Sequence, residues 1–147
     1  MSECPFCKIL QGELPSSVVH QDERCTAILD IQPINQGHVL ILTNDHVESL
    51  AELDPGTGAH IFNLAQDIAA AIRNSGIQCE GVNLLLADGK SAMQEVPHFH
   101  LHVIPRYAED GFQFQFGPTY FELPTRDELN KNAEHIKRSL QDIRPEE

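Results

Sequence analysis

The sequence predicts an α+β domain in which mostly antiparallel strands form a sheet, one long helix packs on that sheet, and further helices lie at the chain ends. Two observations carry this prediction. Short segments rich in β-branched and apolar residues recur between clusters of turn formers, and one stretch after Asp54 repeats apolar residues at helical spacing. The 147 residues contain no internal repeat, low-complexity segment or linker, so we expect a single domain over residues 1–147.

The first part of the chain is predicted to form a short helix and three strands. Gly12 ends the helical turn, and "QDER" supplies the hairpin turn between the first two strands. The segment "DIQPINQG" is rich in turn formers, whereas "HVLILT" is β-branched and apolar. In chain order, the predicted elements are a helical turn at 4–11, strands at 17–20 and 25–29, a loop at 30–37 and a central strand at 38–43.

The long helix has clear start and stop signals. Asp54 suits the N-cap and Pro55 the first helical position, and "NSG" at 74–76 ends the pattern. Between them, apolar residues follow the i, i+3, i+4, i+7 rule, so one stripe of the helix should face the core. The stripe consists of Ile61, Leu64, Ala65, Ile68, Ala69 and Ile72.

The last part of the chain is predicted to add strands and a C-terminal helix to a core that ends near residue 117. Thr125 and Glu128 fit a capping box that opens an amphipathic helical extension at about 125–141. Its apolar stripe should pack on the domain or on a second subunit. The predicted strands are "GVNLLLA" at 81–87, a histidine-rich strand at 97–104 and "FQFQF" at 112–116 as an edge strand or ribbon; the stripe is Leu129, Ala133, Ile136 and Leu140.

Charge and composition argue against several classes of partner. Asp and Glu number 22 against 10 Lys and Arg, giving a net charge of −12, which disfavours broad nucleic-acid binding. A small phosphate ligand is compatible, because backbone donors and histidines hold one locally. No apolar run approaches the roughly 18 residues of a membrane span, and no secretory signal is visible. We therefore expect a cytoplasmic protein with reduced cysteines, and neither nucleic acid nor membrane as partner.

The segment "PHFHLHVIP" places a histidine at every second position. Strand side chains alternate between faces, so His98, His100 and His102 share one face, while the apolar residues between them belong to the core. Imidazoles without partners are costly to bury, so this face should meet polar groups, metal or ligand. Either several of these histidines bind one metal, or one acts as a nucleophile or general base.

The motif "HFHLHVI" resembles the signature of the histidine triad (HIT) family, His-φ-His-φ-His-φ-φ with φ hydrophobic. The resemblance extends to "CPFCKILQGELPSSVVHQDERCTAILDIQPINQGHVLILTNDH" and to "ADGKSAMQEVPHFHLHVIPRY", and it covers roughly residues 3–117. The chain is most similar to bacterial-type members and to the purine nucleoside phosphoramidase branch. This resemblance implies a HIT-like fold and a homodimer.

The resemblance also implies a reaction, because family members are hydrolases and transferases that act on nucleoside phosphoramidates, aminoacyl adenylates or dinucleoside polyphosphates. His100 would attack the α-phosphorus to form a nucleotidyl-histidine intermediate, which water would then hydrolyse. His98, His102 and Gln94 would assist, the last two by contacting phosphate. The attack requires that the second ring nitrogen of His100 be bonded to a backbone carbonyl.

The ligand implied by the resemblance is a purine nucleotide similar to AMP. Asp30 stands at the position that holds the ribose hydroxyls, although capping of the turn before "IQP" also explains this residue. Four apolar residues match the positions that sandwich the base, although their pattern alone would place them in the core. They are Ile9, Ile28, Leu29 and Ile31.

Bacterial-type members often carry a structural zinc, and the resemblance places its ligands at Cys4, Cys7, His46 and His98. Two thiolates and two imidazoles make a closed tetrahedral set, which would leave no position for substrate. The alternatives are a pair of free thiols or a redox C-x-x-C, although the βαβ context typical of a redox pair is absent.

The chain departs from the family pattern at Ala87, Met93 and Glu95, where the family usually has an amide residue, Gly, and Ser or Thr. Glu95 would repel phosphate as a carboxylate, and Met93 lacks the backbone freedom of Gly. These departures leave open a nucleotide-binding protein with weak or lost turnover. A third hypothesis is a metal-dependent enzyme with its catalytic metal on the triad.

Overall fold

The computed structural model describes residues 3–145 and divides the chain into two compact units, one ending at Phe112 and the other beginning at Gln113. The first two and last two residues of the predicted domain lie outside the described residues. The first unit holds the sheet, two helices and the histidine motif, and the second holds the C-terminal helix. That the second unit is an extension of the same domain stays a prediction.

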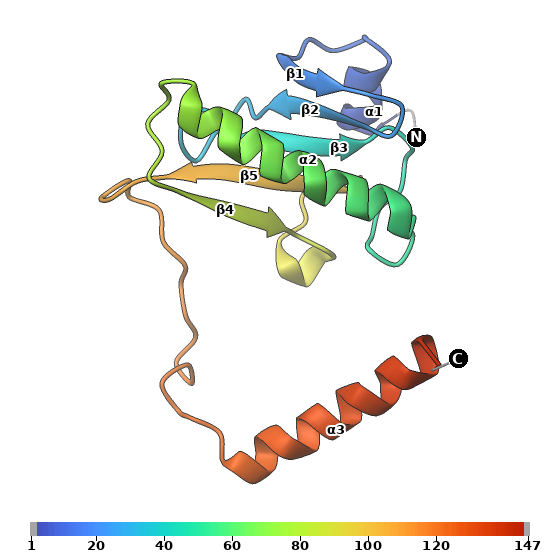
Figure 1. Ribbon diagram of the computed structural model, residues 1–147, viewed down its shortest axis with the longest axis vertical. Coiled ribbons are helices and arrows are strands. Elements are labelled where there is room, and N and C mark those ends of the chain that lie inside the picture. The colour runs from blue at the N-terminus through green and yellow to red at the C-terminus, as the bar shows by residue number, and fades with distance from the viewer. Residues whose placement is uncertain (1–2, 146–147) are drawn as a thin grey trace. The chain divides into compact units, whose positions relative to one another are not determined.

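The sheet of the first unit has five strands in the order β1-β2-β3-β5-β4, and every neighbouring pair is antiparallel (Figure 1). This confirms the predicted α+β class, and the histidine strand is flanked by a strand on each side. The strands are β1 (Val18–Gln21), β2 (Cys25–Leu29), β3 (Val39–Thr43), β4 (Gly81–Leu86) and β5 (His100–Arg106).

The long helix α2 (Pro55–Asn74) covers one face of this sheet and contacts β3 and β5 (Figure 1). Asp54 is the N-cap, and its carboxylate accepts a hydrogen bond from the Thr57 N–H at 2.9 Å. The predicted apolar stripe is confirmed, because Ile61, Ala65, Ile68 and Ile72 are buried and Leu64 and Ala69 pack partly buried beside them.

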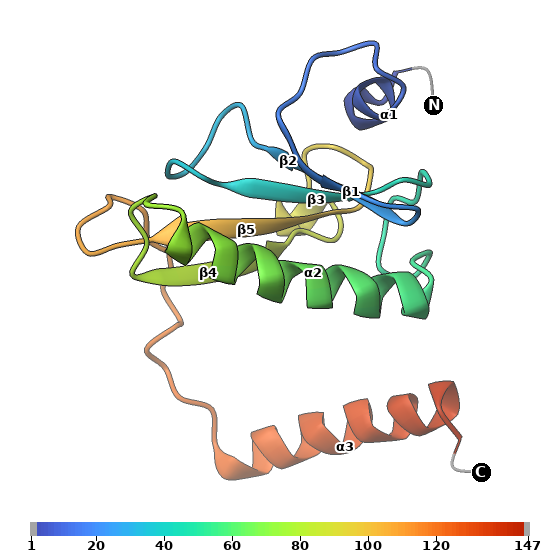
Figure 2. The ribbon, with the colours of Figure 1, turned by 45° about the horizontal axis from the view of Figure 1, so that its top comes forward.

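The short helix α1 (Pro5–Leu10) lies on the opposite face of the sheet (Figure 2). Cys4 is its N-cap, and Phe6 is buried with the apolar residues of β2 and β3 that face this side. Those residues are Ile28, Leu40 and Leu42. The sheet is thus covered on both faces, and only the α1 face also carries the histidines.

The second unit consists of an irregular segment followed by α3 (Arg126–Ile143). The capping box is confirmed: the Thr125 hydroxyl accepts from the Glu128 N–H at 3.2 Å, and the Thr125 N–H donates to the Glu128 carboxylate at 2.7 Å. The apolar stripe is exposed within this unit, with Ile136 at 69 %. Among the described residues, no helix is both long and apolar enough to cross a bilayer.

The prediction of a strand at 112–116 was wrong, because this segment has no regular secondary structure. Alternation of apolar and polar residues sorts side chains between two faces, but a strand also needs a neighbouring strand to which its backbone can hydrogen-bond. In the described sheet, the edge positions are held by β1 and β4.

Candidate functional site

The histidines gather on the α1 face of the sheet as their spacing predicts. In the β3–β5 pairing, His100 lies opposite Leu42 and His102 opposite Leu40, and directly opposed residues share a face. His98 precedes the strand, yet its ring also lies on this side, because Phe6 contacts both the His98 and His100 rings edge-on at 5.8 and 4.9 Å between centroids.

The His100 ring is held in one tautomer by the backbone. Its Nδ1–H donates to the His98 carbonyl oxygen at 2.7 Å, so the Nε2 atom carries a lone pair rather than a proton. The residue is 7 % exposed. This is the arrangement that a histidine nucleophile requires, and it agrees with the condition set by the sequence.

The His102 ring is held by a second histidine, His38, through a chain of hydrogen bonds. The Ile34 N–H donates to His38 Nδ1 at 3.0 Å, which leaves the proton on His38 Nε2. That proton is donated to His102 Nδ1 at 2.8 Å, so His102 carries its own proton on Nε2. Burial lowers the pKa of His102 to about 4, with further lowering from His100 and His38. His102 is therefore neutral at pH 7 and remains a hydrogen-bond donor.

Asp30 lies beside this chain and has the turn-capping role that the sequence allowed. Its Oδ1 atom caps the turn by accepting from the Gln32 N–H at 2.9 Å. Its Oδ2 atom lies 3.6 Å from His38 Nε2. The turn-capping role accounts for one carboxylate oxygen and leaves the other directed at the histidine side.

The proposed zinc ligands Cys4, Cys7, His46 and His98 come together, and their ligand atoms all lie within 4.8 Å of one another. His98 Nδ1 is 3.4 Å from Cys4 Sγ and 3.6 Å from Cys7 Sγ, and His46 Nδ1 is 3.2 Å from Cys7 Sγ. Metal bonds of about 2.3 Å to sulfur and about 2.0 Å to nitrogen set a tetrahedral S···N edge near 3.5 Å. The observed distances fit that geometry.

The tautomer of His98 also suits a metal. Its Nε2–H donates to the Thr43 carbonyl oxygen at 2.7 Å, which leaves Nδ1 unprotonated toward the sulfurs. His98 is fully buried, and burial lowers its pKa. The residue is thus committed to the cysteine side of the motif and not to the face beside His102.

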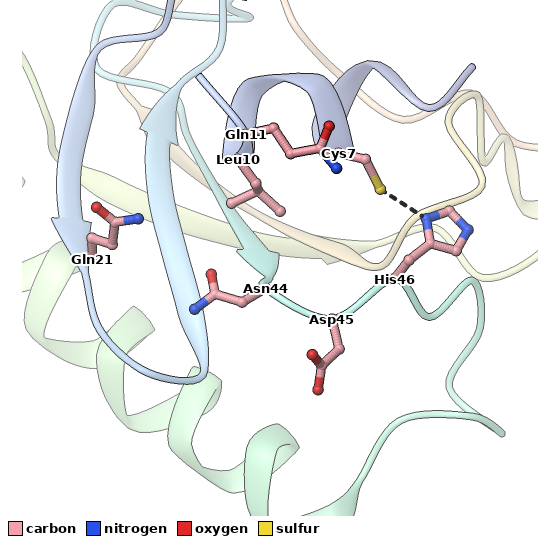
Figure 3. Close-up of a pocket in the computed structure, with 7 residues that line it drawn as sticks. All are labelled: Cys7, Leu10, Gln11, Gln21, Asn44, Asp45 and His46. Atoms are coloured by element: carbon pink, nitrogen blue, oxygen red, sulfur yellow. Dashed lines mark hydrogen bonds between the residues drawn. The ribbon is translucent and has the colours of Figure 1, made fainter. Parts of the chain in front are cut away.

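A hollow of about 450 Å³ opens beside the thiol Cys7 and the ring of His46 (Figure 3). Its other lining residues are Leu10, Gln11, Gln21, Asn44 and Asp45. Cys7 and His46 can therefore be reached from solvent, whereas Cys4 and His98 are buried. These four residues are called the cysteine–histidine set below.

The four predicted base-binding residues do not share one surface. Ile28 faces the histidine side, where Ile9 packs against the same apolar cluster. Leu29 pairs with Val39, a member of the core under α2, so it points to the opposite face. Ile31 lies in the loop and is 97 % exposed. The structure therefore brings Ile9 and Ile28 together and sets Leu29 and Ile31 apart from them.

The loop before the histidine strand holds the remaining predicted residues and contains a short helical turn, η1 (Lys90–Ala92). The Gln94 amide is engaged in the loop itself: its Nε2 donates to the Glu48 carbonyl at 2.7 Å and its Oε1 accepts from the Gly89 N–H at 2.8 Å. Met93 has φ of 66°, a left-handed conformation that favours Gly. Ala87 directly follows β4, and Glu95 is exposed.

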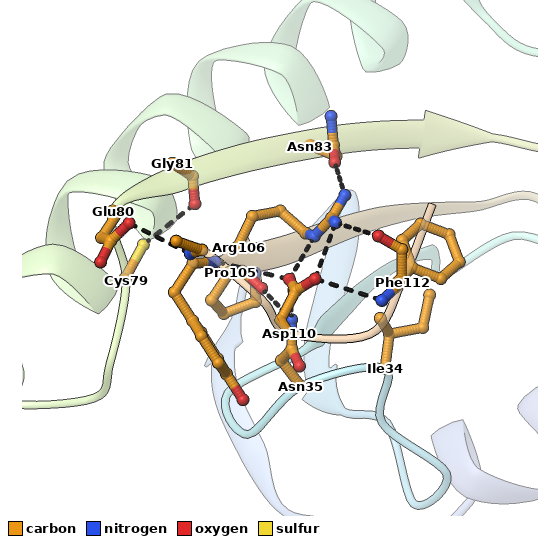
Figure 4. Close-up of polar contacts among 12 residues, drawn as sticks. Ile34, Asn35, Cys79, Glu80, Gly81, Asn83, Pro105, Arg106, Asp110 and Phe112 are labelled. Carbon is orange, nitrogen blue, oxygen red and sulfur yellow. Dashed lines mark hydrogen bonds and ion pairs between the residues drawn. The ribbon is translucent and has the colours of Figure 1, made fainter. Parts of the chain in front are cut away.

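A polar network fastens the loop at 30–37 to the turn that follows β5 (Figure 4). The buried Asn35 donates to the Pro105 carbonyl and to Asp110, each at 2.8 Å. Arg106 donates to the same carboxylate from Nε at 2.6 Å and from Nη2 at 2.9 Å. These hydrogen bonds hold the pKa of Asp110 well below its usual range. The sequence patterns predicted no such network, although "PRYAED" does place the two charges four residues apart.

Comparison with known proteins identifies the fold and the motif. Residues 11–109 match the HIT domain. An uncharacterized HIT-like protein of Borreliella burgdorferi is 42 % identical over 119 residues, 80 % of this chain and 85 % of that protein. The crystal structure of a HIT family protein from Bacillus anthracis is 38 % identical, with a TM-score of 0.83 over 93 % of this chain and 96 % of the other.

Two further matches carry chemical information in their names. A zinc-bound histidine triad family protein from Mycobacterium smegmatis is 34 % identical, with a TM-score of 0.73 over 97 % of this chain and 98 % of the other. Adenylylsulfatase HINT3 of Arabidopsis thaliana is 36 % identical over 109 residues, 74 % of this chain; the match spans 55 % of the plant protein.

Proposed function

The chain belongs to the HIT family, and we propose that it is an enzyme that cleaves purine nucleotide derivatives at the α-phosphate, with His100 as nucleophile. The substrates would be nucleoside phosphoramidates or dinucleoside polyphosphates. The observation that carries the proposal is the 2.7 Å hydrogen bond from His100 Nδ1 to the His98 carbonyl, because it frees Nε2 for attack.

The reaction takes place in two displacements at phosphorus. His100 Nε2 forms a bond to the α-phosphorus while the bond to the leaving group breaks, and the leaving group takes a proton from solvent water. Water then attacks the same phosphorus, the N–P bond breaks, and a nucleoside monophosphate and the free imidazole are released. His102 Nε2–H donates to a phosphoryl oxygen as charge builds up there.

The placement of the nucleotide follows from the neighbouring residues. The Oδ2 oxygen of Asp30 accepts hydrogen bonds from the ribose hydroxyls, and Ile9 and Ile28 contact the base. Ile31 is also proposed to contact the base, from its exposed loop, whereas Leu29 faces the other side of the sheet. The Gln94 Nε2–H group, which donates to the Glu48 carbonyl in the free protein, would donate to a phosphoryl oxygen when the nucleotide binds. The name of the adenylylsulfatase relative is consistent with an adenylyl group as substrate.

Zinc is the proposed occupant of the Cys4, Cys7, His46 and His98 set, as the distances and the zinc-bound relative support. When bound, it would provide a closed structural cross-link between α1 and the start of the histidine strand. His98 would then orient His100 through its backbone carbonyl. The triad rings thus belong to different polar clusters, which favours a structural over a catalytic metal.

Nucleotide binding with weak turnover is the second candidate, and the loop at 87–95 favours it. Met93 holds a strained backbone conformation, the Gln94 amide is occupied, and Glu95 places a carboxylate on the loop that precedes the triad. These features impair the departure of the leaving group without affecting Asp30 or the apolar residues.

A fluorogenic adenosine phosphoramidate separates the two candidates. The wild-type protein should release the fluorophore, His100→Ala should lose at least about a thousandfold in rate, and His135→Ala, in the exposed α3, should keep full activity. Calorimetry with AMP provides the second measurement. Binding of AMP without turnover by the wild-type protein would support the binding protein and overturn the enzyme.

The expected assembly is a homodimer with a continuous sheet across its interface. Among the described residues, β4 is paired only with β5 and lies at the sheet edge, and Phe62 on α2 is 55 % exposed. Sedimentation equilibrium of the wild-type protein and of Phe62→Glu tests this assembly. The four free thiols support the cytoplasm as the site of action.

A further inference from the structure

We propose that His20, Asp22 and His60 form a second metal site, separate from the cysteine–histidine set, that binds a divalent transition-metal ion such as zinc. The three residues come from β1, from the turn after it and from α2. His20 Nε2 lies 2.8 Å and His60 Nε2 2.7 Å from the same oxygen, Oδ2 of Asp22. The two imidazole nitrogens thus contact one carboxylate oxygen, and all three atoms are of types that zinc accepts.

The turn alone does not explain this cluster. Asp22 caps the β1–β2 turn with its other oxygen, Oδ1, which accepts from the Arg24 N–H at 2.8 Å and the Cys25 N–H at 3.0 Å. That role is complete without any histidine. The two imidazoles on Oδ2 come from elements 40 positions apart in the sequence, and neither is needed for the turn.

The geometry permits an ion after a small opening of the cluster. Metal bonds of about 2.0–2.1 Å set tetrahedral N···O edges of about 3.3 Å, roughly half an ångström longer than the observed contacts. The side chains of His20 and His60 are 41 % exposed and that of Asp22 is 26 % exposed, so they can adjust and an ion can reach them from solvent.

The charges also favour a cation over any other ligand. Two neutral imidazoles and one carboxylate carry a charge of about −1, which fits a divalent ion completed by water. Burial opposes ionisation, but the hydrogen bonds from His20 and His60 outweigh it and lower the pKa of Asp22 well below its usual range. The guanidinium of Arg24 lies 4.0 Å from the carboxylate of Asp54 and forms its ion pair there rather than with Asp22.

Cys25 lies below the cluster and is not included among the ligands. Its Sγ atom is 3.7 Å from each Asp22 oxygen, but the residue is fully buried beneath them, whereas the two histidine side chains are 41 % exposed and can be reached from solvent. Without a thiolate, this site should bind zinc more weakly than the cysteine–histidine set, and it should fill second.

Equilibrium dialysis of metal-stripped protein against stepped concentrations of zinc, with elemental analysis, tests the proposal. One zinc equivalent should disappear in Asp22→Asn, which keeps an oxygen acceptor for the turn, and in His60→Gln. The same equivalent should persist in Cys4→Ser/Cys7→Ser and in the control His135→Gln. Zinc added beyond the first equivalent should also raise the melting temperature of the wild type and the control, but not that of the two site variants.

The proposal is overturned if no zinc equivalent depends on Asp22 and His60, whatever the cysteine–histidine set binds. In that case the cluster only links the β1–β2 hairpin to α2 through hydrogen bonds. Circular dichroism of each variant identifies a misfolded protein. If His60→Gln fails to fold, Asp22→Asn and His20→Gln provide the same count, because each removes one ligand from the cluster.

Discussion

His38 Nε2 donates its proton to His102 Nδ1 across 2.8 Å, and the Ile34 N–H fixes the tautomer of His38 from the other side. A backbone amide in the loop at 30–37 therefore determines which nitrogen of a triad histidine carries a proton. The loop that holds Asp30 and the strand that holds His100 are coupled through these two rings.

Removal of His38 should impair catalysis more than binding. In His38→Phe, His102 loses the donor that fixes its tautomer, so kcat should fall by about 10- to 100-fold while KM changes little. His38→Gln, which keeps an amide N–H, should recover part of the loss. Steady-state kinetics with the adenosine phosphoramidate measure both; equal kcat values in the wild type and in His38→Phe would contradict the coupling.

Stability should depend on pH through His102. Its pKa is lowered to about 4 in the folded state from 6.5, so the unfolded chain binds the proton more readily between these values. The free energy of unfolding should therefore fall as pH decreases from 6.5 to 4, by up to about 3 kcal/mol. Urea unfolding at several pH values should show a weaker dependence in His102→Gln than in His135→Gln. Parallel curves for the two variants would refute this assignment.

Chelation should destabilise the protein through the cysteine–histidine set. A ligand at 100 times its dissociation constant contributes about 2.7 kcal/mol to folding, so a strong chelator should lower the melting temperature by several degrees. The hollow beside Cys7 and His46 gives the chelator access. Cys7→Ser should melt lower and respond less to the chelator, whereas Cys79→Ser should respond like the wild type. A chelator effect of the same size in Cys7→Ser would exclude this site.

The polar network around Asp110 should hold in position the loop at 30–37, which contains Asp30. Asp110→Ala removes the shared acceptor of Asn35 and Arg106, so the loop at 30–37 should loosen and KM should rise several-fold, with a smaller effect on kcat. Asp142→Ala, at an exposed position of α3, is the matched control. If KM stays constant while the melting temperature falls, the network serves stability alone.

The protein should be more stable with glycine than with alanine at position 93. A side chain on a backbone with φ of 66° destabilises the folded state by about 1 kcal/mol. This cost offsets or exceeds the destabilisation that Gly causes by giving the unfolded chain more conformational entropy. Met93→Gly should therefore be about 0–1 kcal/mol more stable than Met93→Ala in denaturant unfolding. A gain in turnover in the same variant would show that the loop conformation limits the reaction. Lower stability of the Gly variant than of the Ala variant would argue against strain at this position.

The sequence determined those features that depend on short-range periodicity and on local hydrogen bonds. Period-two spacing placed His100 and His102 on one face, because successive side chains of a strand point to opposite sides. The caps at Asp54 and Thr125 followed from side chains that bond to backbone groups two or three residues away. The resemblance to the HIT family then indicated the positions of the cysteines and of Asp30.

The tertiary structure decided everything that depends on partners distant in the chain. Only the folded chain shows that His38 bonds to His102 and that Leu29 faces away from Ile28. It also gives the 3.4 Å distance between His98 and Cys4, which lie 94 positions apart in the sequence. It also shows that 112–116 forms no strand despite its alternation. The physical reason is that a side chain's local pattern fixes its direction, whereas its hydrogen-bond partner and its strand neighbour are fixed by packing between segments that the sequence keeps apart.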